Sequence, residues 1–330
     1  MDQHSTKTGA AGITGDTDTA VIAVGETAAA DAPPARRRFA RLRLGAYTRD
    51  RKFIAGISIV GFFALVALIG PAFVGDPLRQ TGPIMDGPSG DHWLGTTNNG
   101  QDVLTQLVVG TRSSLLVGLI AGLVSVTLAT LVGMIGGYAG GWVDELFNMF
   151  SNIFLVIPGL PLVIVLASYL QGSDINGLWV IGMVIALTSW AASARVLRAQ
   201  TLSLRRRDYV DAARASGERT WRIMFVEILP NLSPILISQF IWAVLGAILA
   251  EAGLSFLGLG DLQSTTWGTM LFFAQNGEAL RLGAWWWFAP PGVCIALLGA
   301  GLTLINLSVD EVINPRLRVY KQRKSRKGTR

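Results

Sequence analysis

The stretch SSLLVGLIAGLVSVTLATLVGMIGG, from Ser113 to Gly137, contains no Asp, Glu, Lys or Arg. A helix rises about 1.5 Å per residue, so about 20 such residues cross the roughly 30 Å hydrocarbon core of a bilayer. The stretch is therefore predicted to be a transmembrane helix. Its glycines, among them Gly118, Gly122 and Gly133, favour close helix packing, which is how helices associate in lipid.

Five further stretches are also free of Asp, Glu, Lys and Arg and are long enough to cross the membrane. They are Phe53–Val74, Leu146–Leu170, Ile175–Ala194, Ser233–Ala250 and Leu282–Val309. The composition agrees, because 51% of the residues are hydrophobic and 15% are charged, and the mean hydropathy is +0.45. The sequence therefore predicts an all-α integral membrane protein with six transmembrane helices.

The positive charges predict the orientation of these spans. Of the 28 Lys and Arg residues, 25 lie in residues 1–52, 195–222 and 316–330, which six spans place on one side. By the positive-inside rule, that side is the cytoplasm and both termini are cytoplasmic. The net charge of +6 does not indicate a nucleic-acid partner, because the basic clusters are split among short segments next to the membrane, where contact with lipid explains them.

Metal and catalytic chemistry are not expected. Two His and one Cys cannot form a Cys/His metal site, and no Gly-Lys-Ser/Thr phosphate-binding loop occurs. Cys294 is interpreted as a small buried hydrophobe, and His92 as a lone histidine in a polar loop. We therefore predict a non-enzyme that needs no metal or cofactor, with any ATP hydrolysis carried out by another subunit.

One acid lies at the end of an otherwise apolar span. An acid within a membrane span is energetically costly, so its presence suggests a functional role. Glu251 is therefore a candidate gate residue. The interpretation that we favour is a structural role, in which Glu251 lies at the helix end and makes hydrogen bonds at the outer membrane interface.

The longest predicted cytoplasmic loop contains RRRDYVDAARASGERTWRIMFVEILPN, from Arg205 to Asn231. Its pattern predicts two short helices around a glycine. Asp208 is the expected N-cap of the first helix, with Asp211 three residues on, and Gly217 is the expected left-handed stop. A helix over Tyr209–Ser216 is too short to be stable alone, so it needs a partner surface.

The same loop resembles the coupling loop of bacterial ABC importer permeases. The resemblance rests on Asp211-Ala212-Ala213, three residues, Gly217, eleven residues and then Leu229-Pro230. It implies a type I ABC importer (MetI-like) permease fold, in which this loop, Tyr209 included, docks into an ATPase subunit. The family usually has Glu where this chain has Asp211.

Other blocks are similar to the C-type permease subunits of dipeptide and oligopeptide importers. They include His92-Trp93-Leu94-Gly95-Thr96, Gly136-Gly137-Tyr138 and the segment from Leu254 to Gly260, and the resemblance covers about Arg49 to Arg318. Thr97 and Gln101 depart from the Asp and Arg usual in the outward motif. The resemblance implies import of di- or oligopeptides, with nickel, glutathione or another small solute as the alternative and a secondary transporter as a distant one.

The implied partners are a second homologous permease, two ATP-binding subunits and an extracytoplasmic solute-binding protein, in the bacterial plasma (inner) membrane. The expected organisation is a disordered cytoplasmic tail (1–45), a first transmembrane helix with an extracytoplasmic segment (46–110), a core permease domain (111–312) with its coupling loop (195–232), and a basic cytoplasmic tail (313–330).

Overall fold

A computed structural model describes residues 50–170 and 177–313. The predicted tails, 1–45 and 313–330, lie outside these residues apart from Ile313, as does the start of the span predicted over Ile175–Ala194.

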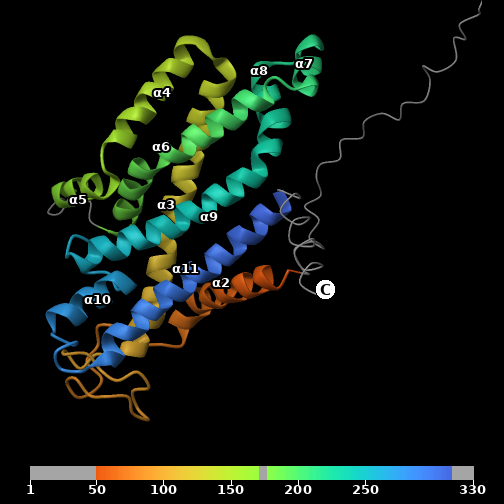
Figure 1. Cartoon of the computed structure of the whole chain (residues 1–330). Helices are drawn as coiled ribbons and strands as arrows, with labels where there is room; N and C mark the ends of the chain where they lie inside the picture. Colours follow the sequence, from red (N-terminus) through yellow and green to blue (C-terminus); the bar gives the residue numbers. More distant parts are fainter. Residues whose placement is uncertain (1–49, 171–176, 314–330) are drawn as a thin grey trace, which may run out of the picture. The chain divides into compact units, whose positions relative to one another are not determined.

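The described part of the chain is helical, and no strand occurs in it (Figure 1). The elements in chain order are α2 (Arg51–Ile69), η1 (Gly70–Ala72), α3 (Val103–Ala139), α4 (Gly141–Val156), α5 (Gly159–Leu170), α6 (Leu178–Leu204), α7 (Asp208–Ala215), α8 (Thr220–Arg222), η2 (Ile223–Ile228), α9 (Leu229–Phe256), α10 (Trp267–Asn276) and α11 (Trp285–Ile313). Two isolated bridges, Gln80 with Gln101 and Thr96 with Asp102, tie together the connection between η1 and α3.

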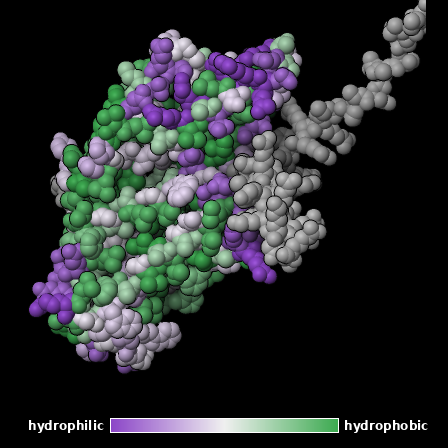
Figure 2. All heavy atoms as spheres, viewed as in Figure 1, coloured by the Kyte–Doolittle hydropathy of each residue, from purple (hydrophilic) through white to green (hydrophobic). Residues whose placement is uncertain are grey.

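Within residues 50–170 and 177–313, five helical stretches are long and apolar enough to cross a membrane, and α4 and α5 together give a sixth if the bent pair is one span. Figure 2 shows hydrophobic residues over the middle of the visible face, and hydrophilic residues gathered around α7 and toward the opposite end. Many large apolar side chains are exposed, such as Phe62 and Leu68 on α2. Such a surface suits lipid or partner helices, which confirms the prediction of an all-α membrane protein.

The third predicted span, Leu146–Leu170, is not one straight helix. It divides into α4 and α5, whose axes differ by 85°. Pro158 lies at the break and has no backbone N–H to donate, and a residue before proline is pushed out of the helical region. Ile157 accordingly adopts an extended conformation, with φ −76° and ψ 123°. The hydropathy of the stretch gave no sign of this bend.

The centre of the bundle is the contact between α3 and α6. A Cβ atom at Gly133 would lie 2.5 Å from the carbonyl oxygen of Ala194, and one at Gly137 would lie 2.9 Å from that of Arg198. The absence of side chains at these two positions lets the helix backbones touch, as expected from the glycine content of the sequence. Helix α3 is also in contact with α9, so it links two faces of the bundle.

The 37 residues of α3 exceed one membrane crossing, so the helix extends to both ends of the bundle. We call these the α7 end, near Tyr138, and the α10 end, near Val103 (Figure 1). At the α10 end, the loop before α3 is held by His92, whose Nδ1 lies 3.0 Å from Oδ1 of Asp102. The expectation of a lone histidine was wrong, because this pair is brought together by the fold of the loop.

Replacing Gly133 with Ala should lower the free energy of unfolding by about 1–3 kcal/mol, because the new methyl group overlaps the α6 backbone. Thermal unfolding in detergent measures the effect. The matched control is Gly246→Ala, since a Cβ at Gly246 has no atom within 4 Å. Equal melting temperatures for the two variants would show that α3 and α6 are not held in close contact.

Candidate functional site

The short helix α7 is held to the bundle by one buried side chain. Val210 is fully buried in a cluster with Met134 of α3, Ile223 and Ile228 of η2 and Leu232 of α9. Ala213, one turn later, packs half-buried against the same cluster. An eight-residue helix is too short to be stable alone, so these contacts are what keep it folded. The surface that stabilises the helix therefore belongs to the chain itself, and the predicted contact with a partner stays a prediction.

An arginine fastens the same helix from the side. The Arg214 guanidinium lies 5.2 Å from the centre of the Tyr138 ring and donates through Nε to the Tyr138 hydroxyl at 3.4 Å. Its Nη1 also donates to Asp211 Oδ1 at 3.0 Å. The hydrogen bond to Tyr138 is the main cause that raises the pKa of Arg214 above its ordinary value. Helix α7 is thus fixed to the end of α3 by a cation–π contact as well as by packing.

The other face of α7 is exposed. Asp208, Asp211, Ala212 and Ala215 recur at the spacing of one helix face, and all four are exposed. Tyr209 beside them is 37% exposed, and its partial burial raises the pKa of the phenol. We call these five residues the α7 face. Its two alanines have small side chains, and the whole face is open to another protein.

The predicted N-cap is displaced by one residue. Arg207 is the cap of α7 and makes no side-chain capping bond, whereas Asp208 is the first helical residue. Asp208 and Asp211 still lie in the first turn, where negative charge interacts favourably with the helix dipole.

Gly217 has the left-handed conformation that the sequence predicted, with φ 74°. Its N–H donates to the Arg214 carbonyl, and the next N–H, of Glu218, donates to that of Ala213. No atom lies within 4 Å of where a Cβ would be. The position is therefore restricted by backbone conformation and not by space.

Leu229 and Pro230 lie where η2 becomes α9. The Leu229 N–H donates to the Met224 carbonyl, five residues back, as in a π-helix. Leu229 packs half-buried on the Val210 cluster, while Pro230 is exposed. The wider π-turn precedes a proline that could not complete an ordinary helical bond. The second predicted short helix is consequently not separate: Thr220–Phe256 is one continuous helical stretch.

Two further arginines at the α7 end make contacts that were not predicted. Arg205 Nη1 donates to the Gly137 and Tyr138 carbonyls at 3.1 and 3.2 Å and so satisfies the end of α3. Arg198 of α6 forms a two-bond ion pair with Asp144 of α4, at 2.5 and 2.7 Å. The sequence predicts only lipid contact for Arg205, since nothing in its sequence neighbourhood points to a carbonyl 67 residues earlier in the chain.

Glu251 lies far from the α7 face, on the part of α9 next to α10. It is 1% exposed, and its Oε1 accepts from the Ser255 and Thr266 hydroxyls at 2.7 and 2.8 Å. Thr266 is the N-cap of α10. We expected hydrogen bonds near a helix end and found them. The acid lies in the protein interior, where it joins α9 to α10.

These features define a class of protein: a helical membrane protein with several spans and a short surface helix anchored at one end of the bundle. Residues 129–319 match the model of the family described as binding-protein-dependent transport system inner membrane component. The chain belongs to this family, which confirms the resemblance inferred from the coupling-loop motif.

Individual relatives extend the match over most of the chain. The dipeptide transport system permease protein DppC of Alkalihalophilus pseudofirmus is 33% identical over 86% of this chain and 91% of its own length. DppC of Bacillus subtilis is 34% identical over 82% of this chain and 83% of its own. The oligopeptide transport system permease protein OppC of Bacillus subtilis is 31% identical, over 82% and 88%.

Replacing Val210 with Ala should loosen α7 by about 2 kcal/mol, because two buried methyl groups are lost from the cluster. Faster tryptic cleavage after Arg206 and Arg207 in detergent would report the opening of the helix. Val196→Ala is the control, since Val196 is a helical valine that is 40% exposed. Cleavage as slow as in the control would mean that Val210 does not hold α7.

Proposed function

We propose that this chain is the transmembrane permease subunit of an ATP-driven, binding-protein-dependent importer of di- or oligopeptides. The observation that carries the proposal is the α7 face: a short helix anchored to the core through Val210 that exposes Asp211 and Ala212 next to a left-handed Gly217. Peptide as the solute is supported by the names of the relatives, which are dipeptide and oligopeptide permeases. The alternative solute is nickel, glutathione or another small molecule. Uptake of one of these in place of peptides would favour it.

In this proposal the α7 face docks into an ATPase subunit that carries out all ATP hydrolysis, so the chain itself is not an enzyme. Trp221 and Phe225, on the helical stretch that follows α7, are exposed with their rings 6.5 Å apart and add an apolar surface to this end of the bundle. The assembly would contain a second homologous permease, two ATP-binding subunits and a solute-binding protein in the bacterial plasma membrane.

The contacts of α7 suggest how movement would be transmitted. A displacement of the helix acts directly on α3 through Met134 and Tyr138, and on the start of α9 through Leu232. These two helices belong to the packed core, so ATPase closure can bias the bundle between two packings without a reacting group in this chain.

The α7 end is proposed to be cytoplasmic. The start of α2 and the end of α11 lie together, since Lys52 Nζ is 3.1 Å from Glu311 Oε1. The Ser238 hydroxyl, in the first part of α9, donates to Asp310 at 3.0 Å and so ties the end of α11 to the helix that begins at the α7 end. A tag at either terminus should therefore be protected from external protease in intact cells, whereas a tag inserted within residues 83–89, at the α10 end, should be cleaved. Cleavage of a terminal tag with protection of the inserted one would reverse the orientation.

Replacing Gly217 with Val should abolish peptide uptake. A β-branched residue at φ 74° is strained by about 1–3 kcal/mol, which shifts the chain that leaves the α7 face while the spans are unaffected. The measurement is ATP-dependent uptake of labelled di- and tripeptides by vesicles holding the assembled importer, normalised to embedded subunit. ATP hydrolysis stimulated by the loaded binding protein should fall together with uptake.

The control is Gly61→Val, because Gly61 lies within α2 and a Cβ there has no atom within 4 Å. Unchanged uptake by Gly217→Val would show that the loop is only a connector. Absence of peptide uptake by the wild-type importer, with uptake of another solute, would refute the peptide assignment.

A further inference from the structure

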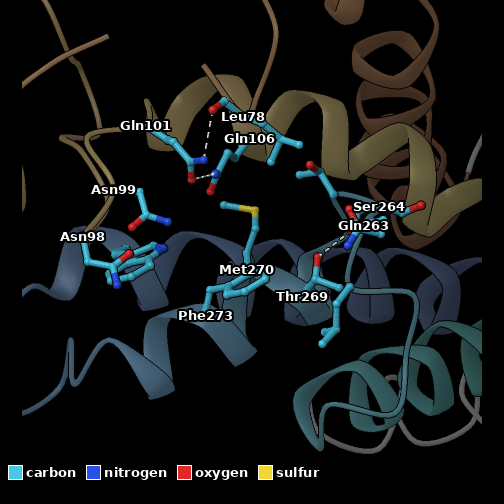
Figure 3. A pocket seen from close by; sticks show the side chains of 13 residues that line it. Leu78, Asn98, Asn99, Gln101, Gln106, Gln263, Ser264, Thr269, Met270 and Phe273 are labelled. Carbon is cyan, nitrogen blue, oxygen red and sulfur yellow. Dashed lines mark hydrogen bonds between the residues drawn. The ribbon is translucent and has the colours of Figure 1, made fainter. Parts of the chain in front are cut away.

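A pocket at the α10 end has no role in the coupling described above. It has a volume of about 260 Å³ and lies between the start of α3, the loop before it, and α10 (Figure 3). Typical small-molecule sites occupy roughly 300–1,000 Å³, so this pocket is suited to a fragment of a few atoms' length and not to a large ligand.

Side-chain amides dominate its polar lining. Asn98, Asn99, Gln101, Gln106 and Gln263 all line the pocket. Each amide carries both a donor and an acceptor. None of the 13 described residues that line the pocket is an Asp, Glu, Lys, Arg or His. Thus the pocket offers many hydrogen bonds and no charge.

Two of these amides are held by each other. Gln106 Nε2 donates to Gln101 Oε1 at 2.9 Å and to the Pro77 carbonyl at 3.2 Å, and Gln101 Nε2 donates to the Leu78 carbonyl at 3.1 Å. Because both bonds use the Gln106 amide nitrogen, the side-chain carbonyl of Gln106 is held in place and is still free to accept a hydrogen bond. In Figure 3 the Met270 side chain points from α10 toward this pair.

Two of the remaining three amides, those of Asn98 and Asn99, lie on one turn. Asn98 and Asn99 occupy the middle of a turn in which the Gly100 N–H donates to the Thr97 carbonyl. Thr97 is buried, and its hydroxyl accepts from the Asn99 and Gln101 backbone N–H groups. Within residues 50–170 and 177–313, the Asn98 and Asn99 side-chain amides have no hydrogen-bond partner. The turn therefore presents both amides at the rim of the pocket.

The opposite wall is fixed independently. Thr266, the N-cap of α10, donates to the buried Glu251, and the Trp267 N–H donates to the Ser114 hydroxyl of α3 at 3.1 Å. These bonds set the position of the helix whose Met270 and Phe273 form the apolar part of the lining. Both walls are thus preorganised before any ligand enters.

From this chemistry we infer that the pocket binds the uncharged interior of a peptide, one peptide unit with a small apolar side chain, during import. A peptide unit has one N–H donor and one C=O acceptor, which the asparagine amides can pair together. A terminal ammonium or carboxylate would enter without a charged partner, which is costly. The inference rests on the proposed peptide import and adds a site in the permease that reads the peptide backbone.

The test uses the complete importer in nanodiscs without its binding protein. The probe is N-acetyl-alanyl-photoleucyl-alanine amide, which has no charged end, and labelled residues are identified by mass spectrometry after irradiation. Labelling should be saturable, fall on the pocket, and be displaced by N-acetyl-Ala-Gly-Ala-amide at about one tenth of the concentration that zwitterionic Ala-Gly-Ala requires.

The variant is Asn98→Ala with Asn99→Ala, which removes two exposed amides without an internal bond. It should need about tenfold more probe for half-maximal labelling. Gln275→Ala is the matched control, an exposed amide on α10 that does not line the pocket, and it should label as the wild type does. Labelling of the double variant at the wild-type concentration would overturn the inference.

A protein loop is the competing occupant. A photo-crosslinker attached at Asn98→Cys that captures the peptide-free binding protein, with no probe labelling of the pocket, would assign the pocket to docking and overturn the inference. ATP-dependent uptake of labelled di- and tripeptides is measured in parallel, in vesicles that hold the wild-type importer together with its binding protein. Uptake without pocket labelling refutes this inference alone, whereas no uptake refutes the proposed function.

Discussion

Backbone hydrogen bonding in hydrocarbon is the constraint on which the whole structure depends. Without water, each N–H and C=O in the membrane must be satisfied within the protein, and a helix does this locally. Lipid provides no hydrophobic drive between helices, so they associate where their surfaces fit. Gly133 and Gly137 allow this fit between α3 and α6. At the break around Pro158 the chain bends by 85° into a second helix, α5.

The α7 end follows from the same packing. A helix as short as α7 cannot persist in water, and its stability is supplied by Val210 in a cluster formed by α3, η2 and α9. A helix held in this way moves only if the cluster moves with it. The proposed ATPase contact therefore lies on one side of a rigid element whose other side is part of the bundle core, and this is the geometry that a mechanical coupling needs.

The two ends of the bundle differ in their chemistry. Arginines dominate the α7 end, where Arg198, Arg205 and Arg214 each have a defined partner. The polar lining of the pocket at the α10 end consists of neutral amides and hydroxyls. Glu251 connects this end to the core by fixing the cap of α10. A neutral site suits transient contact with a passing solute, because no strong charge pair has to be broken for release.

The sequence alone determined the membrane class, the approximate spans, the family and the left-handed Gly217, because these depend on local composition and on backbone conformation. Tertiary structure decided the bend in the third span, the continuity of η2 with α9, the His92–Asp102 pair, the carbonyl partners of Arg205 and the burial of Glu251. The hydrogen bonds of His92 with Asp102, of Arg205 with the Tyr138 carbonyl and of Glu251 with Thr266 all join residues at least ten positions apart. Hydropathy and motif spacing carry no information on such pairs, since the relative placement of helices comes from side-chain packing. The roles of Tyr209, Asp211, Ala212, Ala213, Leu229 and Pro230 in coupling stay predictions, because they concern a surface whose partner is another chain.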